Sequence, residues 1–362
     1  MDEVGMKKED LDTPVLWVDL DRLAENITSL GTYFKVAGVN WRPHTKGVKI
    51  PAIAHMAIGA GAIGVTCAKL GEAEVMAANG IHDILIANQI VGPHKVTRLV
   101  NLCKQADVKI AVDSGETLAA LSQAATRKRV EVGILVELNT GMERAGVLPG
   151  EPAVELSRKV HAAPGLRYQG LMAWEGHACV SEETDWKEKE IKRSVGLLAD
   201  TADKCRAAGL PVSIVSGGGS GTYKVTSNLG GITEIQAGGA VFNDVSYRSW
   251  GVETHESLYV RATVTSRPSL TRMITDAGWK TLPGWIGQPV PMGLDGVENM
   301  SMSAEHGTVT FSAPNTDVRV GDAFDFMVSY TDVTLFLHDR LYGIRDDLVE
   351  VVWPITGRGK LR

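Results

Sequence analysis

The fold is decided by a short basic stretch near the N-terminus, Trp41-Arg42-Pro43-His44-Thr45-Lys46-Gly47-Val48-Lys49. It follows a short extended run and precedes an Ala- and Ile-rich segment, 50–60, of helical composition. A strand-end lysine flanked by Arg and His can form a Schiff base, because nearby cations or desolvation favour the neutral amine that attacks a carbonyl. The same stretch also fits a basic strand end facing solvent, so the rest of the chain decides between the two interpretations.

Eight apolar extended runs alternate with segments of helical composition. Parallel strands buried on both faces have this appearance, and eight strand–helix units close a (β/α)8 barrel. We therefore predict an α/β fold with a TIM barrel over about residues 20–250, and an open doubly wound sheet is the alternative. The predicted strands are 39–44, 63–68, 83–88, 109–114, 132–139, 169–174, 213–218 and 234–239. The predicted helices are 21–34, 50–60, 70–78, 93–104, 114–125, 153–162 and 186–208.

Polar and glycine residues end most of these strands, where barrel enzymes carry their active sites. The glycine run after the seventh strand leaves backbone N–H groups accessible, which suits a phosphate. It fits neither a Walker loop nor a dinucleotide fingerprint. The strand-end residues are Lys46, Asn88, Asp113, 139–144, Glu175-Gly176-His177, 216–221 and 236–239.

The pattern changes after about residue 252 to short runs separated by Gly, Pro and Asp. Such runs predict an antiparallel β domain formed by residues 251–362 together with 1–19, whose strand 15–20 precedes the barrel. A chain of 362 residues is long enough for a barrel and a further domain. The predicted strands are 258–264, 307–311, 323–328, 334–337 and 348–352.

The net charge and the cysteine content limit the possible binding partners and the cellular compartment of the protein. The net charge is −6 and no basic tract is present, so we expect neither nucleic acid nor a membrane as partner. The first residues lack the features of a signal peptide, and the four cysteines form no CxxC pair. We therefore expect a cytoplasmic protein with reduced thiols. Cys179, two residues after His177, is a minor candidate for a catalytic thiol.

Motifs along nearly the whole chain resemble those of the D-threonine aldolase and D-serine dehydratase-like family. These are pyridoxal phosphate enzymes with the alanine racemase fold. The resemblance rests on the joint order of its motifs: Thr13-Pro14, Arg42-Pro43-His44-Thr45-Lys46, Gly141-Met142-Glu143-Arg144-Ala145-Gly146-Val147, Glu175-Gly176-His177, 216–223, Thr233-Glu234-Ile235-Gln236-Ala237-Gly238, Asp276-Ala277-Gly278, Glu305-His306-Gly307 and Trp353-Pro354-Ile355-Thr356-Gly357-Arg358-Gly359.

The resemblance implies a site for pyridoxal 5'-phosphate. Lys46 matches the Schiff-base lysine, with Lys49 as a competing candidate, and Arg144 matches the arginine beside the phenolic oxygen. Gln236 matches the group against the pyridine nitrogen, where a neutral side chain weakens the electron sink. A strand-end side chain bonded to backbone is the alternative for Gln236, and Tyr223 is a second candidate for its role. The remaining predicted cofactor residues are His44, Ser216, Gly218, Gly219, Ser220, Gly238 and Gly239.

His177 bears most directly on the reaction type. In the D-threonine aldolase branch a Glu-Gly-His motif supplies the base that removes the proton of the substrate's β-hydroxyl. An imidazole suits that role near neutral pH. A lone histidine is often structural, but the end of a barrel strand favours a catalytic one.

The match breaks at the position of the family's metal. The family holds a divalent ion, manganese or magnesium, with a His and an Asp or Cys two residues apart, and strand positions i and i+2 face the same side. Here these positions are Tyr330 and Asp332, and a neutral phenol is a poor ligand for a hard cation. His306 or His338 could complete a site, and Val48 replaces a histidine common in the family.

The sequence therefore predicts a pyridoxal phosphate-dependent carbon–carbon lyase. It would cleave D-3-hydroxy amino acids to a glycine-type amino acid and an aldehyde, or catalyse the reverse. The alternatives are dehydratase (ammonia-lyase), racemase or aminotransferase chemistry, and lastly a non-catalytic pyridoxal phosphate-binding protein. The missing metal ligand counts most against dehydration, which has to expel hydroxide. The fold family also implies a homodimer.

Overall fold

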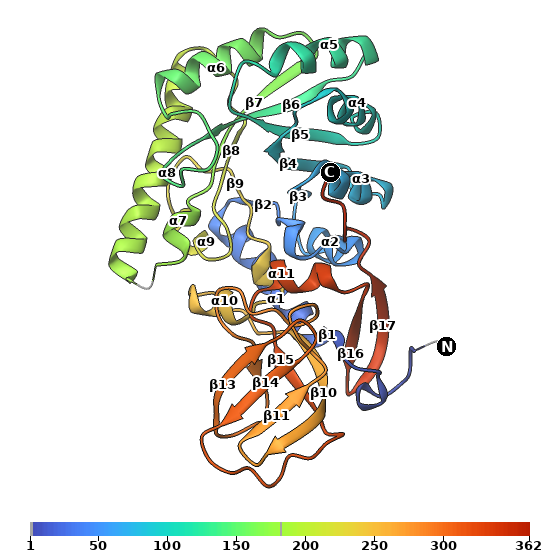
Figure 1. Cartoon of the computed structure of the whole chain (residues 1–362). Coiled ribbons are helices and arrows are strands. Elements are labelled where there is room, and N and C mark those ends of the chain that lie inside the picture. Colours follow the sequence, from blue (N-terminus) through green and yellow to red (C-terminus); the bar gives the residue numbers. More distant parts are fainter. Residues whose placement is uncertain (1–2, 182) are drawn as a thin grey trace. The chain divides into compact units, whose positions relative to one another are not determined.

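The computed structural model describes residues 3–181 and 183–362. These residues form two compact units, which are described separately (Figure 1). The barrel unit comprises Leu30–Lys46, Pro51–Gly238 and Gly359–Arg362, and the β unit comprises the chain up to Ser29, Gly47–Ile50 and Gly239–Arg358.

Eight parallel strands form the sheet of the barrel unit, as the sequence predicts. Their spatial order is β2 (Asn40–Trp41), β9 (Glu234–Ile235), β8 (Ile214–Gly217), β7 (Leu166–Ala173), β6 (Val132–Leu138), β5 (Asp107–Val112), β4 (Asp83–Gln89) and β3 (Val65–Cys67). The two end strands meet, because the Trp41 carbonyl accepts from Ile63 N–H and the Pro43 carbonyl from Thr66 N–H, both at 2.9 Å. The sheet is therefore a barrel, which excludes the open doubly wound alternative.

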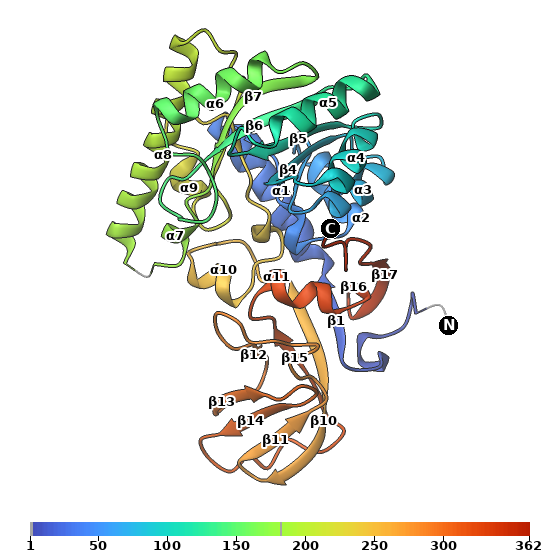
Figure 2. The ribbon, with the colours of Figure 1, turned by 45° about the horizontal axis from the view of Figure 1, so that its top comes forward.

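The helices of the barrel unit lie on the outside of this sheet (Figures 1 and 2). All seven residues of β6 are buried, which explains why the parallel strands appear in the sequence as continuous apolar runs. The seven predicted helices are confirmed within a few residues. The helices are α1 (Leu20–Ala37), which begins in the β unit, α2 (Pro51–Gly59), α3 (Leu70–Ala78), α4 (Pro93–Leu102), α5 (Leu118–Lys128), α6 (Glu151–Ala162), α7 (Gly176–Cys179), α8 (Thr184–Ala207) and α9 (Tyr223–Thr226).

The β unit is built on a mostly antiparallel sheet. Its main path runs β13 (Val297–Met302), β14 (Gly307–Phe311), β11 (Arg272–Thr275), β10 (Leu258–Ser269), β1 (Val15–Asp19), β16 (Arg340–Arg345) and β17 (Leu348–Pro354). Off this path, β15 (Ala323–Met327) pairs with β10 and with β12 (Val290–Pro291). The N-terminal strand β1 is antiparallel to β10 and parallel to β16. The Trp17 ring stacks on Tyr259 at 4.7 Å, which anchors β1 in this sheet.

One predicted strand of this unit, 334–337, is wrong. The segment is helical, with α11 (Thr331–Thr334) followed by a 3-10 turn, Leu335–Leu337. The short apolar run Leu335-Phe336-Leu337 favoured a strand. In the structure the amide and hydroxyl of Thr331 both donate to the carboxylate of Asp244 at 2.7 Å, which caps the first turn of the helix. Asp244 precedes α10 (Val245–Ser249), 87 residues earlier, so no local pattern could reveal this cap. Strands β11, β12, β13 and β16 had not been predicted.

Among the described residues, no helix combines the length and the apolar character needed to cross a bilayer.

Candidate active site

Lys46 lies in a 3-10 turn, Thr45–Gly47, shortly after β2. Its backbone N–H donates to Nδ1 of His44 at 3.3 Å, which ties the histidine to the lysine turn. Gly238, after β9, lies so close that a Cβ there would collide with the His44 carbonyl oxygen. Only glycine fits this contact. The structure therefore brings three predicted cofactor residues together at the carboxyl ends of neighbouring strands.

The competing lysine, Lys49, lies in a different setting. It belongs to the β unit, its side chain is buried, and its φ of 55° is in the left-handed region. Its carbonyl accepts from Gly357 N–H at 3.0 Å, so its backbone is fixed by the C-terminal motif. These contacts hold the backbone of Lys49 within the β unit.

The glycine run after β8 is held by one buried carboxylate, a strand-end residue whose role toward this loop was not predicted. Glu175, only 2% exposed, accepts from Gly218 N–H at 3.3 Å and from the hydroxyls of Thr222 and Thr226 at 2.8 and 2.7 Å. A Cβ on Gly219 would collide with the Trp174 ring. Glu175 thus fixes the shape of the predicted phosphate loop. The available signal was an acidic residue placed directly after an apolar strand.

Glu175→Gln is expected to lower the free energy of unfolding by about 1–3 kcal/mol, because an amide cannot accept all three hydrogen bonds and leaves a buried donor unpaired. Cofactor retention is expected to weaken as well. Urea unfolding and cofactor release on dialysis measure the two effects. Glu131→Gln, an exposed position, is the matched control and is expected to change neither quantity. Unchanged stability and retention in Glu175→Gln would show that the loop does not depend on this carboxylate.

A neutral side-chain pair joins the ends of β8 and β9. The Gln236 amide donates to the Ser216 hydroxyl at 2.9 Å, and both residues are buried. Gln236 therefore bonds the side chain of another predicted cofactor residue. The Tyr223 ring packs against Tyr33 and Phe34 with centroids 5.0 and 5.5 Å apart.

Two further predicted residues of the glycine motifs are buried. Ser220 lies in the loop that Glu175 holds. Gly239 belongs to the β unit, where a Cβ would collide with the Tyr247 ring.

His177, in α7, forms a hydrogen-bonded chain with two residues of α8. Its Nε2 lies 2.7 Å from Oε1 of Glu190, and Arg193 donates to both Glu190 oxygens at 2.5–3.0 Å. Gly141, at φ +132°, leaves room for the chain, because a Cβ there would lie 2.8 Å from His177 Nε2. Arg193 also donates to the Thr140 carbonyl at 2.7 Å, which fixes α8 against the loop after β6.

The charge state of Glu190 determines the tautomer of His177. Hydrogen bonds from Arg193, and secondarily from His177, lower the pKa of Glu190 to about 2. An ionised carboxylate only accepts, so the proton between the two groups belongs to Nε2 and Nδ1 carries the lone pair. Nδ1 is buried and has no hydrogen-bond partner within residues 3–181 and 183–362. Glu190 and Arg193 were missed, because a Glu and an Arg three apart on a long helix usually form a solvated pair.

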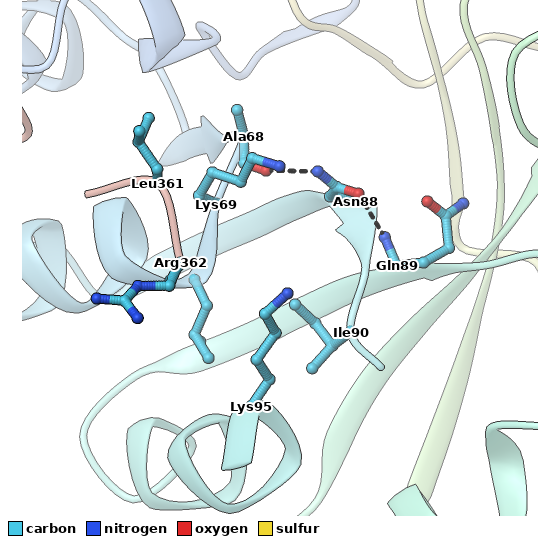
Figure 3. Close-up of a pocket in the computed structure, with 9 residues that line it drawn as sticks. Ala68, Lys69, Asn88, Gln89, Ile90, Lys95, Leu361 and Arg362 are labelled. Atoms are coloured by element: carbon cyan, nitrogen blue, oxygen red, sulfur yellow. Dashed lines mark hydrogen bonds between the residues drawn. The ribbon is translucent and has the colours of Figure 1, made fainter. Parts of the chain in front are cut away.

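Arg144, in the loop after β6, is about half exposed and lies 3.6 Å from Glu137 at the end of β6. Glu137 also accepts from Gln89 at 2.5 Å. Burial raises the pKa of Glu137, and the hydrogen bond from Gln89 and the charge of Arg144 oppose this shift. A small pocket lies at the ends of β3 and β4, and Asn88 and Gln89 are among the residues that line it (Figure 3). There the Asn88 side chain donates to the Ala68 carbonyl.

Cys179, the candidate thiol, is unsuited to nucleophilic catalysis. Burial raises its pKa to about 11, so the thiol stays protonated near neutral pH. The charge of Lys187 and, to a smaller extent, that of Lys46 oppose part of this shift, as does a hydrogen bond from the Gly221 backbone.

The two residues at the predicted metal position, Tyr330 and Asp332, lie in the β unit at the start of α11. The Tyr330 hydroxyl donates to Oδ2 of Asp332 at 2.8 Å, so the phenol is neutral. Burial and the neighbouring Asp332 charge raise the pKa of Tyr330 further. His338 bonds the Thr281 carbonyl at 2.7 Å, and His306 is exposed.

Within the described part of the chain, no group of three or more His, Cys, Asp or Glu residues could hold a metal ion. One carboxylate and one neutral phenol do not fit a divalent cation.

Comparisons with known proteins identify relatives along nearly the whole chain. The family model described as "Alanine racemase, N-terminal domain" matches residues 18–245, and "Putative serine dehydratase domain" matches 257–344. The 3-hydroxy-D-aspartate aldolase of Paracoccus denitrificans is 33% identical, covering 98% of this chain and 94% of the relative. The D-threonine aldolase of an Arthrobacter species is 32% identical, covering 96% of this chain and 93% of the relative. The crystal structure of D-threonine aldolase from Filomicrobium marinum has a TM-score of 0.96 at 34% identity, covering 99% of this chain and 98% of that one.

Proposed function

Because the chain belongs to the D-threonine aldolase family of alanine-racemase-fold enzymes, we propose that it is a pyridoxal phosphate-dependent carbon–carbon lyase acting on D-3-hydroxy amino acids. It cleaves them to a glycine-type amino acid and an aldehyde, or catalyses the reverse. The observation that carries the proposal is the His177–Glu190–Arg193 chain, which presents an oriented base in the same unit as Lys46.

The residues of the barrel unit suit the cofactor. The amine of Lys46 would hold it, and the loop that Glu175 fixes, with Gly218, Gly219, Ser220 and Gly238, would surround its phosphate. His44 would border the cofactor, and Arg144 would face its phenolic oxygen. The neutral Gln236–Ser216 pair would face the ring nitrogen of the cofactor. When bound, the cofactor supplies the electron sink for a carbanion at Cα.

In this mechanism His177 is the general base. Glu190 holds the imidazole with Nε2 protonated, so the Nδ1 lone pair takes the proton of the substrate's β-hydroxyl. The C–O bond of the substrate then gains carbonyl character as the Cα–Cβ bond breaks, and the bonding electron pair stays with Cα. The aldehyde leaves, and reprotonation of Cα completes the amino acid product. Arg193 keeps Glu190 ionised and in place throughout.

The other reactions open to this scaffold give different products. Dehydration yields a keto acid and ammonia, racemisation the L-amino acid, and transamination a keto acid with transfer of the amino group. A non-catalytic cofactor carrier gives no product.

An assay of the cofactor-loaded protein with D-threonine, D-serine and 3-hydroxy-D-aspartate tests the proposal. Aldehyde is expected from the D-enantiomers, and none is expected from L-threonine. The released aldehyde is measured by its reduction with NADH and an alcohol dehydrogenase. Keto acid without aldehyde would contradict the lyase assignment. A cytoplasmic homodimer with a small amino acid as substrate is part of the same proposal, and sedimentation analysis measures its oligomeric state.

A further inference from the structure

The hydroxyl–carboxylate pair formed by Tyr330 and Asp332 has a geometry that excludes a cation. A metal ligand must turn a lone pair toward the ion, whereas the Tyr330 hydroxyl turns its proton toward Oδ2 of Asp332 at 2.8 Å. The proton therefore occupies the side of the carboxylate that an ion shared by both residues would need. The pair satisfies one oxygen of the carboxylate with a neutral donor.

The position of the Tyr330 ring is fixed by aromatic packing. Its centroid lies 5.5 Å from that of Tyr247 and 5.6 Å from that of Trp250, the second in an edge-on arrangement. Turning the ring aside to expose Asp332 would break both contacts. The hydroxyl consequently stays directed at the carboxylate.

The position of Asp332 is fixed on its other side by the chain itself. Its Oδ1 lies so close to Gly47 that a Cβ on this glycine would collide with it. Gly47 follows Lys46 directly in the sequence. The start of α11 is held in addition by the bonds from Thr331 to the buried carboxylate of Asp244. The carboxylate thus lies against the residue next to the Schiff-base lysine, and its remaining neighbour at this position is the Tyr330 hydroxyl.

We propose that the Tyr330–Asp332 pair takes the place of a divalent metal in this chain, and that the lyase works without such an ion. The first part concerns binding alone, and the second rests on the proposed function. The single change that separates this position from a His-x-Asp cation site is Tyr330, since a histidine there would offer an imidazole nitrogen two residues before the carboxylate.

Manganese binding tests the first part without turnover. The full-length protein, treated with EDTA and dialysed, is titrated with Mn2+ while the free ion is followed by electron paramagnetic resonance. Wild type and Tyr330→Phe are expected to leave the signal of the free ion unchanged, whereas Tyr330→His is expected to bind about one ion per chain. Tyr330→Phe is the matched control, because it keeps the ring packing and removes only the hydroxyl. Stoichiometric binding by wild type, or none by a folded Tyr330→His, would overturn the proposal.

EDTA treatment tests the second part. Aldehyde release by the wild type is expected to change less than about twofold after EDTA, because no step depends on an ion. A loss of activity that Mn2+ or Mg2+ restores would overturn metal independence and leave the lyase assignment standing. If no substrate gives aldehyde before EDTA is added, the proposed function fails, while the manganese titration still decides the binding proposal.

Discussion

Lys46→Ala is expected to lower the rate of aldehyde release at least about 1,000-fold, because the amine that anchors the cofactor and exchanges with the substrate is removed. The visible absorption band of the bound cofactor, near ~420 nm, is expected to vanish at the same time. Absorption spectra and the aldehyde assay measure the two effects on the same sample. Circular dichroism confirms that the variant is folded.

Lys49→Ala is the matched control for this experiment. Lys49 is three residues away, and its contacts are structural, so its variant is expected to keep the visible band. Loss of the band in Lys49→Ala together with its retention in Lys46→Ala would move the Schiff base to Lys49. Loss in neither variant would mean that the band does not arise from a lysine adduct at this turn.

His177→Asn is expected to lower kcat for aldehyde release by about 10²–10⁴-fold, the contribution typical of a positioned general base. The visible band is expected to remain, because His177 acts on the substrate and does not anchor the cofactor. Steady-state kinetics with D-threonine measure the effect. A fall below about threefold would show that another group removes the hydroxyl proton.

Glu190→Gln separates orientation of His177 from its chemistry. An amide can donate to the imidazole as well as accept from it, so the tautomer that keeps the lone pair on Nδ1 is no longer enforced. The loss in kcat is expected to be smaller than in His177→Asn, at about 10-fold. An unchanged kcat would show that the carboxylate only packs against the ring. Glu188→Gln, an exposed position on the same helix, is the control and is expected to behave as wild type.

The barrel could be predicted because the burial of each parallel strand shows in the strand's own residues. A parallel strand covered on both faces must be apolar throughout, as β6 is, and strand ends must carry the polar groups. Lys46 and His177 follow from that rule together with the motifs. The helix 331–334 could not be predicted, since the carboxylate that caps it belongs to Asp244, far away in the sequence.

The supporting residues of the site escaped prediction for a similar reason. Glu190 and Arg193 resemble an ordinary charged helix face, and only the tertiary structure turns that face toward His177. Glu175 is the first residue of the Glu-Gly-His motif, but the partners that show its role are threonines 47 and 51 residues later. In both cases the charged residue is visible in the sequence, but the residues that it bonds are identified only by the tertiary structure.

A proton NMR time course of the cofactor-loaded protein with D-threonine tests the central claim most directly. The account predicts that glycine and acetaldehyde appear in equal amounts as D-threonine disappears, and that this conversion is lost in Lys46→Ala. Formation of 2-oxobutanoate or of L-allothreonine without acetaldehyde would contradict it.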